Sequence, residues 1–131
     1  MPSILAVESA QSGKLCLAVG DARRGSYWTS RVENFGLASE PELCDVAELE
    51  AVIKSAEGVS LFSFEDPARF QLQAEFAARI KLEFPNAARL WQAWQRACEV
   101  SRHKWAIDPP QPIYLKPPHI TPTKRGSLIK P

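Results

Sequence analysis

Two aspartates, Asp21 and Asp66, are placed in the sequence so that they could form a pair of catalytic carboxylates. Asp21 ends a stretch of alternating apolar residues, and Asp66 follows a second such stretch at residues 59–64. If these stretches are parallel neighbours in one sheet, Asp21 and Glu65 or Asp66 lie near the carboxyl ends of adjacent strands. Such a pair could bind Mg²⁺ and clamp the attacking and leaving oxygens of a nuclease reaction.

Both aspartates also have structural explanations. Asp66 precedes Pro67, which is the pattern of a helix N-cap followed by proline at the first helical position. Asp21 opens a turn, where an aspartate side chain accepts a hydrogen bond from the nearby backbone. No further acid or histidine completes a second metal site. The structural interpretation of Asp21 and Asp66 is therefore favoured, and we expect neither a catalytic residue nor a bound metal.

The other groups with chemical potential are isolated in the sequence. His103 and His119 have no cysteine or histidine at ligand spacing, and no nucleophile stands near them. Cys16, Cys44 and Cys98 are odd in number and far apart, which favours reduced thiols packed as small apolar residues. No glycine-rich phosphate-binding motif occurs. We expect no cofactor and no ATP site.

Length and composition are those of one ordinary globular domain. The chain has 131 residues, 45% of them hydrophobic, and a net charge of +1. No apolar run approaches the roughly 18–20 residues of a membrane span, and the first ten residues do not resemble a signal peptide. We expect a cytoplasmic protein with no membrane partner. Charge is uneven, because from Arg102 onward six lysines and arginines stand against one acid.

The residues around Asp21 predict a β-hairpin. Residues 14–22 alternate between two apolar sets, as a strand covered on both faces does. Residues 26–34 contain Tyr, Trp, Thr and Val, which favour strands. The connection Arg23-Arg24-Gly25 has turn length, and replacing Gly25 should be costly if its φ is positive. A third short strand within residues 36–44 is expected at a sheet edge, because Pro41 favours that position.

Helical and strand patterns then alternate. Asp45 with Glu48 forms a capping-box pattern, and Gly58 ends the helix it starts. Strands are predicted at 59–64 and 80–84, the second with Ile80, Leu82 and Phe84 on one side. Between them a helix starts at Asp66-Pro67 and buries Phe70, Ala74 and Ala77. A long helix over 87–103 carries Leu90, Trp91, Trp94, Ala97 and Cys98 inward, which leaves Trp105 as the exposed tryptophan.

This order predicts an α/β fold of the ribonuclease H-like type. It consists of a mixed five-stranded sheet with helices on both faces and right-handed crossovers. We expect residues 1–108 to form a single lobe, with a leading helix over residues 1–12. Residues 109–131 hold seven of the eleven prolines. They should form an extended basic tail that packs partly on the lobe.

Two segments carry a family resemblance. In "LCLAVGDARRGSYW" a strand ends in Asp-Ala-Arg-x-Gly before an aromatic return strand, and "QPIYLKPPHITPTK" holds Pro-x-Tyr-Leu-Lys before a polar tail. Together they resemble the second lobe of the bacterial TsaB (YeaZ) family. The leading "PSILAVESA" is similar to the short helix before the hairpin there. The match falls on Asp21, Ala22, Arg23 and Gly25, and on Pro112, Tyr114, Leu115 and Lys116.

The resemblance implies a non-catalytic role. TsaB proteins are two-lobed members of the actin-like ATPase superfamily, similar to the glycoprotease-like subunit that makes threonylcarbamoyladenosine on tRNA. They act as partners of that subunit and of a small ATPase. The chain departs from the pattern in four ways. It has no stretch resembling the family's first lobe, it has Ser26 where an acid is usual, and it has "FSFEDP" where a Gly-x-Gly-like loop is usual. Lys116 also stands where arginine is commoner.

Three functional interpretations remain open. The preferred one is a scaffold lobe of the tRNA-modification machinery, followed by a stand-alone module that dimerises through an exposed apolar face, and then by a metal-dependent nuclease. Arg24, Lys116, Lys124 and Arg125 are possible contacts to a partner or to RNA. The tail could bind tRNA backbone or an acidic partner, act only as a solubilising end, or pack back on the lobe through Ile113, Tyr114 and Leu115.

Overall fold

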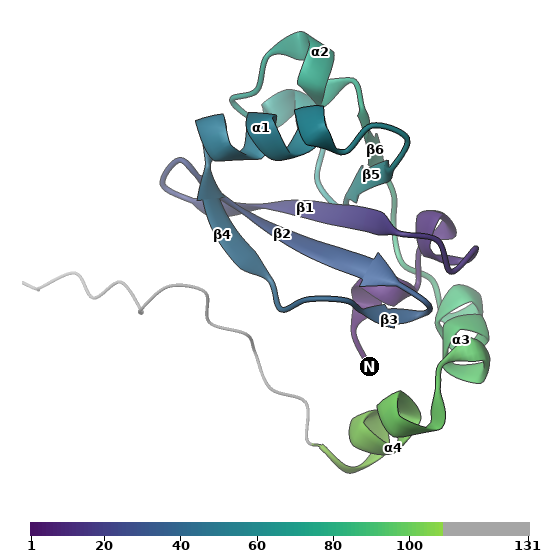
Figure 1. Cartoon of the computed structure of the whole chain (residues 1–131). Helices are drawn as coiled ribbons and strands as arrows, with labels where there is room; N and C mark the ends of the chain where they lie inside the picture. Colours follow the sequence, from purple (N-terminus) through teal and green to yellow (C-terminus); the bar gives the residue numbers. More distant parts are fainter. Residues whose placement is uncertain (109–131) are drawn as a thin grey trace, which may run out of the picture.

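The computed structural model describes residues 1–108, which form an α/β fold around one mixed, six-stranded sheet (Figure 1). The predicted hairpin is confirmed: β1 (Cys16–Arg23) and β2 (Ser26–Glu33) pair antiparallel. β5 (Ser60–Ser63) lies parallel to β1 on its other side, and β6 (Ile80–Leu82) lies parallel to β5. Residues 109–131, with the predicted tail contacts, lie outside the described residues.

The expected third strand is divided in two. β3 (Gly36–Leu37) pairs with the end of β2, and β4 (Glu42–Asp45) pairs with its beginning. Pro41 lies between them, and it has no backbone N–H to donate to a ladder. The sheet order is therefore β3-β2-β1-β5-β6, with β4 beside β3 on the outer side of β2. This correction makes the sheet six-stranded where five strands were expected.

The helix that follows β4 forms as predicted. α1 (Val46–Ser55) begins at a capping box, in which the Glu48 amide donates to Asp45 Oδ1 over 2.8 Å and the Asp45 amide donates to Glu48 Oε1 over 3.3 Å. Beyond the helix, Gly58 has φ +75°, a conformation that favours glycine. These local signals were sufficient to locate both ends of the helix.

The helix predicted after Asp66 is largely absent. One 3₁₀ turn, η3 (Pro67–Arg69), is followed by an extended Phe70 and then by the single turn of α2 (Ala74–Ala77), where Ala74 is exposed. Tertiary contacts explain the interruption. The Phe70 ring meets the Tyr27 ring edge-on at 5.3 Å, and the Gln71 amide donates to the Tyr27 hydroxyl over 2.9 Å.

The long last helix is also wrong, because the chain breaks into α3 (Ala87–Arg96) and α4 (Glu99–Ile107). Ala97 is extended at the break and Cys98 caps α4. Of the residues predicted to point inward, Ala97 is buried and Leu90 and Trp94 are half-buried, while Trp91 is 59% exposed and Cys98 is also exposed; Ala93 is the buried residue of α3. Trp105 was expected to be exposed, but it is half-buried with its ring centroid 6.2 Å from that of Trp94.

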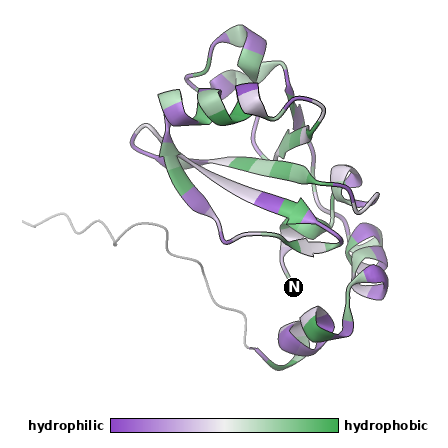
Figure 2. Ribbon diagram, in the orientation of Figure 1, coloured by the Kyte–Doolittle hydropathy of each residue, from purple (hydrophilic) through white to green (hydrophobic). Residues whose placement is uncertain are grey.

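The first residues form two 3₁₀ turns, η1 (Ser3–Leu5) and η2 (Glu8–Ala10), where one leading helix was expected. They cover one face of the sheet together with α3 and α4, while α1 and α2 cover the other (Figure 1). Apolar residues are concentrated on the strands between these layers (Figure 2). Helical elements thus cover both faces, as expected. The first core contains Leu5, Val7, Cys16, Ala18, Val32 and Phe62, and the second contains Leu17, Val19, Tyr27, Leu49, Ile53 and Leu61.

Candidate functional site

The family-like motif Asp21-Ala22-Arg23-x-Gly25 forms the β1–β2 corner. Arg23, Arg24 and Gly25 all have positive φ, of +70°, +55° and +73°, and Arg24 and Gly25 are the two central residues of the tight hairpin turn. Ala22 is the extra residue of a bulge, since Asp21 pairs with Tyr27 and Arg23 with Ser26. Asp21 Oδ1 accepts a hydrogen bond from the Arg23 amide over 2.7 Å. These contacts give the motif a local structural role at the tip of the hairpin.

The predicted neighbourhood of Asp21 and Glu65 exists, because β1 and β5 are parallel partners. The Asp21 amide lies 3.4 Å from Glu65 Oε1. Asp66, however, caps η3 by accepting a hydrogen bond from the Ala68 amide over 3.0 Å. Within residues 1–108, no three His, Cys, Asp or Glu side chains gather as a metal site. The described part of this sheet end therefore contains a turn and a cap, without a built metal centre.

The three cysteines are free thiols in different environments. Burial, with a smaller contribution from the Glu83 charge, raises the pKa of Cys16 to about 11. Burial and neighbouring carboxylates raise the pKa of Cys44 to about 11 as well. Cys98 is the exception to the expected packing: it is exposed, and its side-chain hydrogen bond with Ser101 lowers its pKa. His103 is exposed on α4, and His119 lies outside the described residues.

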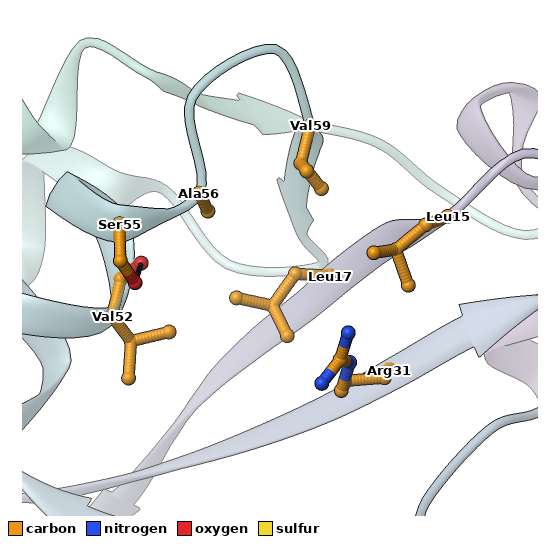
Figure 3. A pocket seen from close by; sticks show the side chains of 7 residues that line it. All are labelled: Leu15, Leu17, Arg31, Val52, Ser55, Ala56 and Val59. Atoms are coloured by element: carbon orange, nitrogen blue, oxygen red, sulfur yellow. Dashed lines mark hydrogen bonds between the residues drawn. The ribbon is translucent and has the colours of Figure 1, made fainter.

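A pocket of about 200 Å³ opens between the β1–β2 ribbon and the end of α1 (Figure 3). Its walls are mostly aliphatic, and the Arg31 side chain rises from β2 beside Leu15 and Leu17. The one hydroxyl in the lining, that of Ser55, donates to the Val52 carbonyl over 3.0 Å. No acid or histidine lines the pocket to activate that hydroxyl. This lining suits the binding of an apolar group that carries a negative charge at one end, near Arg31. It suits catalysis less well.

A candidate surface for partner contact lies at the end of β6. Leu82 and Phe84 are 46% and 62% exposed, whereas Ile80, predicted on the same side of the strand, is buried. Their alternation is correct, but α2 is a single turn and leaves this end of the strand uncovered. No other strand among residues 1–108 pairs with the outer side of β6. We call Leu82 and Phe84 the β6 edge.

The β6 edge is held in place by Glu83, which points to the opposite face. The Glu83 amide donates to the Ser63 carbonyl over 2.9 Å. Its carboxylate accepts hydrogen bonds from the Ser9 amide, over 2.9 Å, and from the Ser9 hydroxyl. The alternation along the segment therefore fixes Leu82 and Phe84 outward. Sequence reasoning missed this surface because alternation identifies a face without revealing whether the face is covered.

Of the remaining predicted contact residues, the structure describes one. Arg24 lies at the exposed hairpin tip. The tail half of the family resemblance lies outside the described residues, together with Pro112, Tyr114, Leu115, Lys116, Lys124 and Arg125.

Comparisons with known proteins found no relatives. A scan against protein-family models gave no match, and searches of curated proteins and of solved structures likewise gave none. Among residues 1–108, no helix combines the length and apolar character that crossing a membrane requires.

Proposed function

We propose that this chain is a non-catalytic, partner-binding lobe of a TsaB-like protein in the modification of tRNA with threonylcarbamoyladenosine. Its partners are then a glycoprotease-like catalytic subunit and a small ATPase. The observation that carries the partner-binding role is the β6 edge, where two large apolar side chains are exposed at the end of β6 and the intervening Glu83 is hydrogen-bonded to Ser9 and to the Ser63 carbonyl. Exposed apolar surface of this kind is typical of interaction sites.

The topology supports the ribonuclease H-like part of the proposal. If β3 and β4 are taken as one interrupted third strand, the strands follow the order 3-2-1-4-5. The first three are antiparallel, and the last two continue parallel to the first. A ribonuclease H-like sheet has this mixed arrangement. The Asp-Ala-Arg-x-Gly motif stands at the corner of its opening ribbon, as the resemblance implies.

The environment of the polar groups supports a non-catalytic role. Asp21 and Asp66 are used by the turn and the helix cap, and Ser55 donates to a backbone carbonyl. None of these side chains is paired with a base that could activate it. What the described surface offers a partner is shape and apolar area.

The test is co-purification of the full chain with the catalytic subunit and the small ATPase. The unmodified chain should be retained, and Phe84→Ser should weaken retention at least tenfold. Val100→Ser is the matched control, because Val100 is 80% exposed on α4 and away from β6. Absence of retention of the unmodified chain, or equal losses in both variants, would count against the proposal.

A second candidate function is homodimerisation through the same β6 edge. It is favoured by the outer side of β6, with which no strand of residues 1–108 pairs, since exposed strand edges are templates for pairing with another chain. Sedimentation at several concentrations distinguishes the two. A dimer that Phe84→Ser dissociates, without retention of the catalytic subunit, would favour this second function.

A further inference from the structure

The outer edge of β6, the last strand in the sheet order, offers backbone groups to a further strand (Figure 1). The Glu83 amide donates to the Ser63 carbonyl of β5, so the backbone groups of Glu83 face β5. Backbone groups of successive residues point to opposite sides of a strand, so those of Ile80, Leu82 and Phe84 point away from β5. No strand of residues 1–108 pairs with them. This edge can therefore pair with an added strand.

The side chains of the same segment alternate between an apolar face and a charged face. Leu82 and Phe84 are exposed on the apolar face. Lys81, which is exposed, and Glu83 lie on the other face. The Glu83 carboxylate accepts hydrogen bonds from Ser9, and each of its oxygens can accept a second one. A matching strand must therefore bring apolar side chains to one face and, to the other, an acid opposite Lys81 and a base opposite Glu83.

A second copy of the same segment meets these requirements in one register. When two copies pair antiparallel about a two-fold axis at Leu82, Leu82 lies opposite its own copy and Ile80 lies opposite Phe84. Lys81 of each copy then lies directly opposite Glu83 of the other, and such opposite-charge pairs stabilise a sheet. Moving the axis by one residue, to Lys81 or to Glu83, would place like charges directly opposite each other, which is destabilising. The order of the charges therefore selects the register centred on Leu82.

We propose that two copies of this chain pair antiparallel along β6, with Leu82 at the two-fold axis and Lys81 of each copy opposite Glu83 of the other. The proposal rests on the second candidate function, homodimerisation through the β6 edge, and specifies its geometry. The catalytic subunit is proposed for the same edge, so the self-paired dimer is the form of the chain without that subunit.

The dimer should be weak. Each copy contributes a short edge strand with two large exposed apolar side chains, whereas a standard interface involves roughly 20–30 residues a side. We therefore expect a dissociation constant above about 10 μM. The experiment must for this reason extend to high protein concentration.

The test is sedimentation equilibrium of the full chain from about 1 μM to about 1 mM, over which the unmodified chain should pass from monomer to dimer. Lys81→Glu places like charges opposite each other twice and should raise Kd at least about fivefold. Lys104→Glu is the matched control, because it makes the same charge change at an exposed position of α4. It should alter Kd by less than about twofold, since salt screens distant surface charges.

A mixture of two charge variants tests the register itself. Glu83→Lys should also weaken self-association, because it too places like charges opposite each other. When it is mixed with Lys81→Glu, both positions again have opposite charges across the two-fold axis. The mixture should therefore associate at least about fivefold more tightly than either variant alone. The Leu82 amide of the unmodified chain provides a readout without substitution, since its hydrogen exchange should slow as the protein concentration rises.

Four results would overturn the proposed pairing. A monomer at about 1 mM would exclude self-association of useful strength. Equal effects of Lys81→Glu and Lys104→Glu, or folded charge variants whose mixture associates no more tightly than its components, would exclude the register. Protection of the Leu82 amide that is independent of concentration would assign the edge to another part of the same chain. None of these measurements contains the catalytic subunit, so their failure is distinct from a failure to retain that subunit.

Discussion

The contact between Gly20 and Trp28 yields the sharpest prediction about the stability of the fold. The two residues are paired across β1 and β2, and the indole occupies the space that a side chain at Gly20 would need. A methyl group added at Gly20 would lie 2.1 Å from Trp28 Nε1 and 2.2 Å from Cε2. The clash is with the middle of a rigid ring system, so Trp28 must leave its position. Gly20→Ala is therefore an overpacking substitution, which typically costs about 1–3 kcal/mol.

Thermal unfolding followed by circular dichroism measures this cost. A loss of 1–3 kcal/mol lowers Tm by about 4–15 °C in a domain of this size. Gly36→Ala is the matched control, because the nearest atom to an added methyl there is Ser101 Oγ at 4.0 Å. In a Trp28→Leu background the indole is gone, so Gly20→Ala should cost less than about 0.5 kcal/mol.

Two results would refute this reasoning. One is a Tm for Gly20→Ala equal to that of Gly36→Ala. The other is an undiminished effect of Gly20→Ala in the Trp28→Leu background, since the substitution would then act through something other than the indole.

Three further predictions concern the thiols, the hairpin turn and the sheet end. Cys98 should be alkylated fastest at pH 7, because its lowered pKa gives more thiolate than the other two thiols, whose pKa is raised to about 11. Ser101→Ala should raise that pKa and slow the reaction; an unchanged rate would contradict this. Gly25→Val should lower the free energy of unfolding by about 1–2 kcal/mol, because Gly25 has φ +73°. Arg24→Ala is the comparison and should change the free energy of unfolding by less than about 0.5 kcal/mol. Equal melting temperatures of the two variants would contradict the turn assignment. Mg²⁺ titration against a fluorescent hairpin substrate should give no cleavage; sustained cleavage abolished by Asp21→Asn would overturn the structural interpretation of that residue.

The sequence signals that succeeded are short-range. The hairpin followed from alternation on both sides of a turn-length connection, and the start of α1 from Asp45 and Glu48, three residues apart. Each depends on hydrogen bonds within a few residues, which residue type alone favours. The parallel neighbourhood of β1 and β5 followed from the order of the elements. The observed sheet contains these predicted features.

The sequence predictions fail where contacts between residues far apart in the chain determine the local structure or its exposure. Tyr27 contacts Phe70 and accepts a hydrogen bond from the Gln71 amide, 44 residues further along the chain, and the predicted helix is interrupted there. Neither proline nor glycine marks the break at Ala97, where the chain turns from α3 into α4. The β6 edge was missed because its exposure depends on the shortness of α2. The Ser30 hydroxyl, which is buried without a hydrogen-bond partner among residues 1–108, is equally invisible in sequence, since burial is a property of the packed core.

The proposed role in tRNA modification is tested most directly by mass spectrometry of tRNA nucleosides. Cells from which the gene for this chain has been deleted should contain less threonylcarbamoyladenosine. The unmodified chain and Val100→Ser should restore it, whereas Phe84→Ser should not. A threonylcarbamoyladenosine content that is unchanged by the deletion would contradict the role proposed for this protein.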